Sequence, residues 1–69
     1  MIAIFKTSVV NSEQAKNIKP YLNQLQTIRA WNFDHEDCDN ILRIDSLTNV
    51  SARVISILRE HGFDCEEIY

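Results

Sequence analysis

Residues 31–45 read WNFDHEDCDNILRID, and this stretch decides the fold because it holds two strand-like segments around a polar one. Aromatic and β-branched residues favour strands at 27–33 and 41–45. The segment between them, DHEDCDN at 34–40, is rich in Asp and Asn, whose side chains bond nearby backbone groups and tolerate left-handed conformations. We therefore predict a β-hairpin in the middle of the chain.

On the N-terminal side of the hairpin, the chain reads as a strand followed by a helix. Residues 2–9 are apolar and partly alternating, which is typical of a strand. Asn11 or Ser12 can cap the helix, and with Asn11 as the N-cap, Gln14 can complete a capping box. Pro20 removes one backbone hydrogen bond and should bend the helix. Residues at spacings of three and four form its apolar face: Ala15, Ile18, Leu22 and Leu25.

On the C-terminal side of the hairpin, a second helix and a last strand follow. Thr48 or Asn49 can cap this helix, and Gly62 is placed to end it in a left-handed conformation. His61 lies in the last turn, and residues 63–68 read as a short strand. An amphipathic stripe runs along the helix and consists of Val50, Val54, Ile57 and Leu58.

The predicted order of elements is β-α-β-β-α-β, which is typical of a ferredoxin-like fold of the α+β class. Right-handed crossovers place both helices on one face of a four-stranded antiparallel sheet with strand order 4-1-3-2. The other face of the sheet stays uncovered, as in an open-faced sandwich. Because 69 residues provide one thin core, we expect residues 1–69 to form a single domain.

Charge and composition exclude several classes of function. Residues 1–33 carry four basic residues against one acid, and residues 34–69 carry three against nine, so balances of +3 and −6 sum to −3. A nucleic-acid binder needs a concentrated basic face, so we expect no nucleic-acid partner. No apolar run approaches the ~20 residues of a membrane span. We expect a cytoplasmic protein in which Cys38 and Cys65 are free thiols.

Catalysis also has little support in the sequence. The chain has no glycine-rich phosphate loop, and its Ser, His and Asp residues show no spacing typical of a nucleophile with its base and acid. We therefore expect a protein that is not an enzyme.

The predicted topology brings three connections to one end of the sheet: residues 8–12, 34–40 and 61–64. Four residues of metal-binding type then lie near this end, namely His35, Cys38, His61 and Cys65. Strand order separates Cys38 and Cys65 by about 10 Å at a strand spacing of ~4.8 Å, so one ion would need bent loops to join them.

Each of these residues also has a plainer structural interpretation. Residues 34–39 can form a solvated hairpin loop that lacks both a tetrahedral zinc pattern and a calcium loop. Cys65 lies where the strand period turns it inward, as a small buried apolar residue. His61 can be a helix-end histidine.

Four pieces of the chain, in their order and spacing, resemble the heavy-metal-associated (HMA) domain. They are IAIFKTSV at 2–9, AKNIKPYLNQL at 15–25, the hairpin at 31–45 and VISILREHGFDCEEI at 54–68. This is the fold of small copper chaperones and of N-terminal modules of metal-transporting ATPases. The resemblance therefore implies a ferredoxin-like fold and a link to Cu or Zn.

The sequence departs from that family where the metal should bind. Metal-carrying members place a Cys-x-x-Cys at the start of the first helix, where two thiolates grip a soft ion. Asn11 and Gln14 occupy those positions here. Amides are poor ligands for soft metals but good helix caps, so we expect no metal at Asn11 or Gln14 and no bound cofactor.

The leading hypothesis is an accessory or interaction module that contacts a protein partner or a second copy of itself. Tyr21, Trp31 and Phe33 are the candidate partner surface, since Trp31 and Phe33 share a strand face with Arg29. Such aromatics either thicken the core or form a contact patch on the uncovered face. The alternative is a Zn- or Cu-binding or metal-sensing protein that uses His35, Cys38, His61 and Cys65. A small-molecule regulatory module is a third option, by fold analogy alone.

Overall fold

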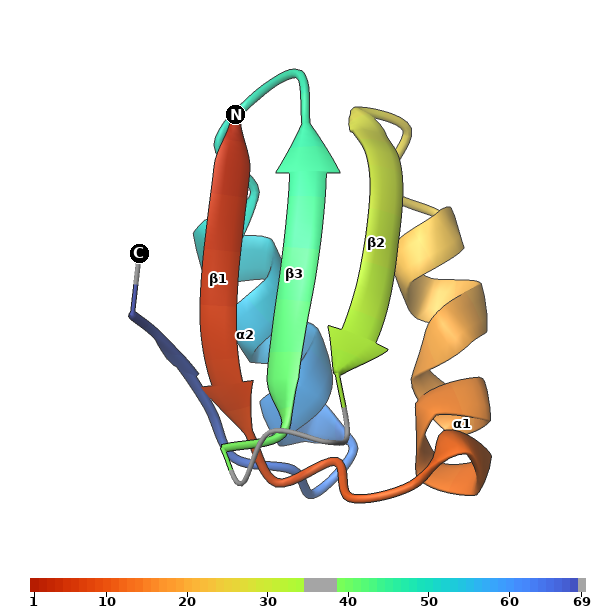
Figure 1. Cartoon of the computed structure of the whole chain (residues 1–69). Helices are drawn as coiled ribbons and strands as arrows, with labels where there is room; N and C mark the ends of the chain where they lie inside the picture. The colour runs from red at the N-terminus through yellow and green to blue at the C-terminus, as the bar shows by residue number, and fades with distance from the viewer. Residues whose placement is uncertain (35–38, 69) are drawn as a thin grey trace.

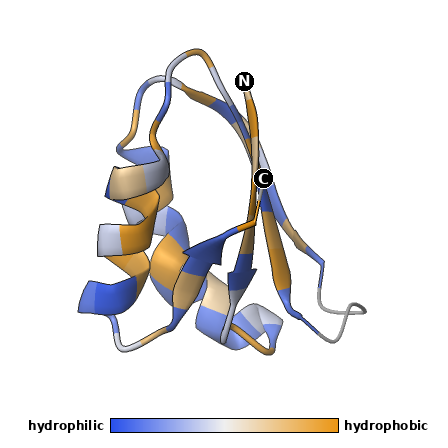
Figure 2. Ribbon diagram, turned by 90° about the vertical axis from the view of Figure 1, so that its left-hand side faces the viewer, coloured by the Kyte–Doolittle hydropathy of each residue, from blue (hydrophilic) through white to orange (hydrophobic). Residues whose placement is uncertain are grey.

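The computed structural model describes residues 1–34 and 39–68. The elements follow one another as β1 (Ile2–Thr7), α1 (Ser12–Asn23), β2 (Ile28–Asp34), β3 (Ile41–Ser46), α2 (Ser51–Glu60) and β4 (Cys65–Glu67). The strands pair in the antiparallel order β2-β3-β1-β4. Both helices lie on one face of this sheet (Figure 1, Figure 2). The predicted ferredoxin-like topology and strand order are confirmed.

The core lies between the sheet and the two helices. The predicted apolar faces of both helices are confirmed, because Ile18 and Leu22 of α1 and Val54 and Leu58 of α2 are fully buried. The strands contribute the other fully buried side chains, together with the loop residue Val9: Phe5, Leu42 and Ile44. Within residues 1–34 and 39–68, no helix is long and apolar enough to cross a membrane.

The first and last strands are shorter than the sequence predicts. β1 ends at Thr7, after which the backbone N–H of Val9 donates to Thr7 Oγ1 at 3.2 Å. β4 begins only at Cys65, because the backbone of Phe63 is bonded to the turn that ends α2. Its N–H donates to the carbonyl of Leu58 at 2.9 Å. Gly62 has a φ of 85°, which confirms the predicted left-handed end of this helix.

The start of α2 differs from the prediction. Val50 occupies the N-cap position, so the prediction of Thr48 or Asn49 as the N-cap is wrong. Asn49 still accepts one bond, from the N–H of Ser51 at 3.0 Å. Ser51 Oγ donates to a carboxylate oxygen of Glu67 at 2.8 Å, so β4 supplies a negative charge to the first turn of α2.

Strand register assigns the aromatic residues of β2 to a face. Trp31 lies opposite Ile44 and Phe33 opposite Leu42, and both partners are buried beneath the helices. Trp31 and Phe33 therefore thicken the core, and their rings form an edge-to-face pair with centroids 5.9 Å apart. A register shift between Ile28 and Ala30 interrupts the simple alternation that grouped Arg29 with them. That the exposed edges of Trp31 and Phe33 form a partner surface stays a prediction.

Candidate functional site

Three connections meet at the end of the sheet where β1 finishes, as the topology predicts (Figure 1). The described parts are residues 8–11 before α1, residues 39–40 before β3, and residues 61–64 after α2. We call these three segments the rim. His35 and Cys38, two of the four candidate metal ligands, belong to the same hairpin but lie outside the described residues.

Two residues at the end of β1 tie the rim together. Ser8 exchanges two hydrogen bonds with Asp64: its N–H donates to the Asp64 carbonyl at 3.1 Å, and its Oγ accepts from the Asp64 N–H at 2.8 Å. Thr7 Oγ1 donates to the carbonyl of Asn40 at 2.7 Å, and the Thr7 N–H donates to the carbonyl of Asp39 at 3.2 Å. Neither residue was among the predicted site residues, although a Thr-Ser pair at the end of a strand is a recognisable signal for side-chain-to-backbone bonds.

At the start of α1, two amide side chains form a closed set of caps. Asn11 is the N-cap, and its Oδ1 accepts from the N–H of Gln14 at 2.8 Å. Gln14 Oε1 accepts from the N–H of Val10 at 2.9 Å. A standard capping box would bond the N–H of the N-cap itself, so this box reaches back one residue further than predicted. The capping role of Asn11 is confirmed.

This arrangement does not fit a soft metal ion. The Asn11 and Gln14 oxygens already accept backbone hydrogen bonds, and an amide nitrogen is a poor ligand. Cu(I) and Zn(II) in such loops favour thiolates, which neither side chain can supply. An ion bound here would have to displace both caps and expose two backbone donors.

His61 is fixed between the two helices. Its Nδ1 lies 2.8 Å from the carbonyl of Ile57, and because a carbonyl only accepts, Nδ1 carries the proton. The imidazole packs against the ring of Tyr21 on α1, with centroids 4.2 Å apart. His61 is therefore a helix-end histidine that keeps Nε2 as its one nitrogen able to bind a metal. Tyr21 remains 41% exposed, so its role in a partner surface stays a prediction.

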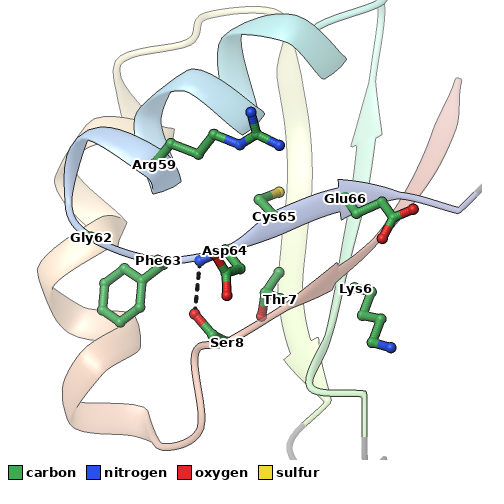
Figure 3. A pocket seen from close by; sticks show the side chains of 9 residues that line it. All are labelled: Lys6, Thr7, Ser8, Arg59, Gly62, Phe63, Asp64, Cys65 and Glu66. Atoms are coloured by element: carbon green, nitrogen blue, oxygen red, sulfur yellow. Dashed lines mark hydrogen bonds between the residues drawn. The ribbon is translucent and has the colours of Figure 1, made fainter.

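Cys65 faces inward beside an open hollow of about 810 Å³ (Figure 3). Its side chain is 2% exposed, which confirms the prediction of a buried residue. Burial raises the pKa of Cys65 from 9.0 to about 11, opposed in part by Arg59 and assisted by Glu67. At neutral pH the group is a thiol, which is a weak nucleophile and a weak metal ligand. The hollow is lined by residues from β1, α2 and β4: Lys6, Thr7, Ser8, Arg59, Gly62, Phe63, Asp64, Cys65 and Glu66.

The described part of the chain does not gather a metal site. Among residues 1–34 and 39–68, no group of three His, Cys, Asp or Glu side chains could hold one ion. The alternative site needs His35 and Cys38 together with His61 and Cys65, so it stays a prediction. Of its two described members, His61 is held by Ile57 and Tyr21, and Cys65 is a buried thiol.

Known structures share the fold of the chain. No family model matches the sequence, and no curated protein matches it. The N-terminal domain of ZntA in its Zn(II) form has a TM-score of 0.81 at 18% identity, covering 97% of this chain and 90% of that one. The N-terminal domain of PacS from Synechocystis PCC6803 has a TM-score of 0.79 at 4% identity, covering 100% and 98%.

A third neighbour is the yeast copper transporter domain Ccc2a, solved in apo and Cu(I)-loaded states. Its TM-score is 0.79 at 20% identity, covering 99% of this chain and 94% of that one. These neighbours are HMA domains, so the predicted resemblance is confirmed at the level of the fold. The metals in their names belong to those proteins.

Proposed function

We propose that this chain is a non-catalytic HMA-like domain that acts through contact with another protein and carries no metal ion at the start of α1. The observation that carries the proposal is the closed set of caps made by Asn11 and Gln14. The neighbouring structures include domains solved with Zn(II) and Cu(I). In this loop the two amide side chains cap the helix instead. A cytoplasmic location is part of the same proposal.

The physical argument concerns what a helix N-terminus stabilises. Its unpaired N–H groups and the positive end of the helix dipole lower the pKa of a nearby thiol and so favour a metal-binding thiolate. Here the N–H of Gln14 is bonded to Asn11 Oδ1, a neutral acceptor. That donor therefore stabilises the fold, and we assign contact with a protein to the exposed surface.

The exposed surface offers apolar side chains for such contact. Several large apolar residues keep about half of their surface in solvent: Met1, Ile2, Val10, Tyr21, Leu47 and Ile68. Scattered exposed apolar residues are ordinary, but neighbouring ones rimmed by charge favour protein contact. Ile2 and Ile68 are such neighbours, because Ile2 lies two residues before Ile4 on β1 and the N–H of Ile68 donates to the carbonyl of Ile4.

A Cu(I) competition titration of the reduced protein against a chromophoric chelator tests the proposal. We expect no stoichiometric uptake by the wild type. The matched control is the double variant Asn11→Cys/Gln14→Cys, which restores the thiol pair and should take up about one Cu(I) per chain, as two thiolates at a helix N-terminus do. One tightly bound Cu(I) in the wild type that is lost in Asn11→Ala or Gln14→Ala would overturn the proposal.

A parallel Zn(II) titration addresses the four-residue alternative. If the wild type binds zinc through the hairpin, Cys38→Ser or His35→Ala should weaken binding by about tenfold or more, the effect of losing one ligand or its support. Equal zinc affinity in the wild type and both variants removes that alternative. Native mass spectrometry of the freshly purified protein reports metal content and oligomeric state together.

A further inference from the structure

The uncovered face of the sheet carries an ordered pattern of apolar and charged residues. On β1, Ile2 lies opposite Asp45 of β3, and Ile4 lies opposite Arg43. Antiparallel partners point to the same face, and the alternate residues Phe5, Leu42 and Ile44 are fully buried on the other face. Two adjacent rows therefore each hold one isoleucine beside one charge, and the charges have opposite sign. Figure 1 shows this face of the sheet toward the viewer.

The apolar part of the pattern continues toward β4. The N–H of Ile68 donates to the carbonyl of Ile4 at 2.8 Å, so these two residues lie side by side. Ile2 is 59% exposed and Ile68 is 42% exposed. On the other side of Ile2, a shallow hollow of about 200 Å³ is lined by Ile2, Ala30, Trp31, Asn32, Arg43 and Asp45.

This pattern is complementary to itself. A twofold axis that lies in the contact plane, perpendicular to the strands and between the two rows, exchanges one row with the other. Ile2 then faces Ile4 of the other copy, while Arg43 faces the other copy's Asp45, twice over by symmetry. Such an isologous contact is the commonest geometry of homodimers. We propose that the uncovered sheet face binds the same face of a second copy of this chain.

The proposal rests on the proposed function and names its partner. A second copy is favoured over an unrelated protein because the face supplies both halves of each contact, apolar against apolar and positive against negative. Lys6 and Glu66 occupy the next row, beyond the two that the axis exchanges, so they stay at the periphery. Lys6 already lies 3.6 Å from Asp39.

The size of the face sets the strength of the contact. Four strands ~4.8 Å apart and about six residues long at ~3.4 Å each give a face of roughly 19 by 20 Å. Full coverage by a second copy then buries about 800 Å² in total, less than the ~1,200 Å² at which stable interfaces begin. We therefore expect a weak dimer with a dissociation constant in the high micromolar range, so that it is populated at about 1 mM.

Sedimentation analysis from about 10 μM to about 1 mM, the range in which a weak complex dissociates, tests the contact. We expect Arg43→Glu or Asp45→Arg alone to weaken dimerisation at least tenfold, because each places like charges opposite one another twice. An equimolar mixture of the two variants should dimerise again. In the mixed dimer the introduced glutamate of one variant meets the introduced arginine of the other, while the native Asp45 of the first meets the native Arg43 of the second. The double variant in one chain should likewise form a homodimer.

Two controls keep the test decisive. Asp45 lies 3.8 Å from the amino group of Met1, so circular dichroism must show that Asp45→Arg is folded. If that variant unfolds, amide shifts of the wild type on dilution give the answer. They should move at Ile2, Ile4, Arg43, Asp45 and Ile68, and movement elsewhere overturns the proposal.

The two proposals can fail separately. A wild type that stays monomeric at about 1 mM, or a dimer indifferent to both charge reversals, overturns the dimer and leaves the metal titration as it stands. Cu(I) uptake lost on replacing Asn11 or Gln14 overturns the proposed function, and the charge-reversal result with a chelator present is unaffected by it.

Discussion

The start of α1 and the end of α2 both lie at the rim, yet they are held in different ways. Asn11 and Gln14 bond only to backbone groups within four residues of themselves. His61 is also anchored at close range, by Ile57, but its ring packs on Tyr21, which is forty residues away. Cys65 is buried between elements from both ends of the chain. One segment is stabilised locally and the other by the tertiary fold.

The difference shows why a residue of metal-binding type does not define a metal site. At the start of α1, Asn11 and Gln14 stand where the resemblance places thiols, and both amide oxygens accept capping hydrogen bonds. At the end of α2, a thiol and an imidazole are present, but Cys65 is buried and His61 is packed against Tyr21. In both segments the same groups that could bind an ion contribute to the stability of the fold.

The largest expected effect concerns the reactivity of Cys65. Its pKa of about 11, two units above 9.0, leaves about one hundredth of the thiolate that an unfolded chain has at pH 8. Burial also blocks access, so alkylation in the native state should be more than about 100-fold slower than in denaturant. Mass spectrometry of a Cys38→Ser variant treated with iodoacetamide reports this site alone. Equal rates in the native and unfolded states would mean that Cys65 is exposed.

Much of this contrast follows from how far a contact reaches along the chain. The N-cap at Asn11 could be predicted because its partner is three residues away, within one sequence pattern. The bond from Ser51 to Glu67 could not be predicted, because the two residues lie sixteen positions apart. The order of the elements and the right-handed crossovers predict the strand order, while the β2 bulge required the register itself. For this reason Trp31 and Phe33 could not be assigned to a face of the sheet from the sequence.

The same distinction applies to the candidate site. The amides at Asn11 and Gln14 are visible in the sequence, and so is the inward period of Cys65. The Thr7-Ser8 pair signals side-chain-to-backbone bonds, but nothing in a single sequence shows that Ser8 pairs with Asp64, 56 positions away. The complementary rows of the uncovered face likewise need the register of β1 against β3.

The second expected effect is a loss of stability at high pH. Below pH 9 Cys65 is protonated in both states, so its titration contributes nothing to the pH dependence. Between pH 9 and about 11 the unfolded chain ionises first, which favours unfolding. The free energy of unfolding of the wild type, relative to Cys65→Ala, should therefore fall by about 2–3 kcal/mol over this window. Urea titrations at pH 8 and pH 11 with a reductant measure this, and a constant difference would contradict it.

A smaller effect is expected at the turn that ends α2. Gly62 has a φ of 85°, and an added Cβ would meet nothing within 4 Å, so Gly62→Ala changes only the backbone strain. The free energy of unfolding should fall by about 1 kcal/mol, because the left-handed penalty is only partly offset by the lower entropy of the unfolded chain. Gly62→Asn is the matched control and should lose less, since Asn tolerates this conformation better. Thermal unfolding measures both, and equal losses would point to a steric cause.

An effect of similar size tests the local caps at the start of α1. Asn11→Ala removes the acceptor for the Gln14 N–H and should cost about 1 kcal/mol of unfolding free energy. Asn11→Asp keeps that acceptor and adds a charge that the helix dipole favours, so it should be neutral or slightly stabilising. Urea unfolding of the three proteins at pH 7 separates the cap from the side-chain volume. If Asn11→Ala and Asn11→Asp have the same free energy of unfolding, the bond from Gln14 to Asn11 does not stabilise the helix. The main observation that supports a metal-free loop is then lost.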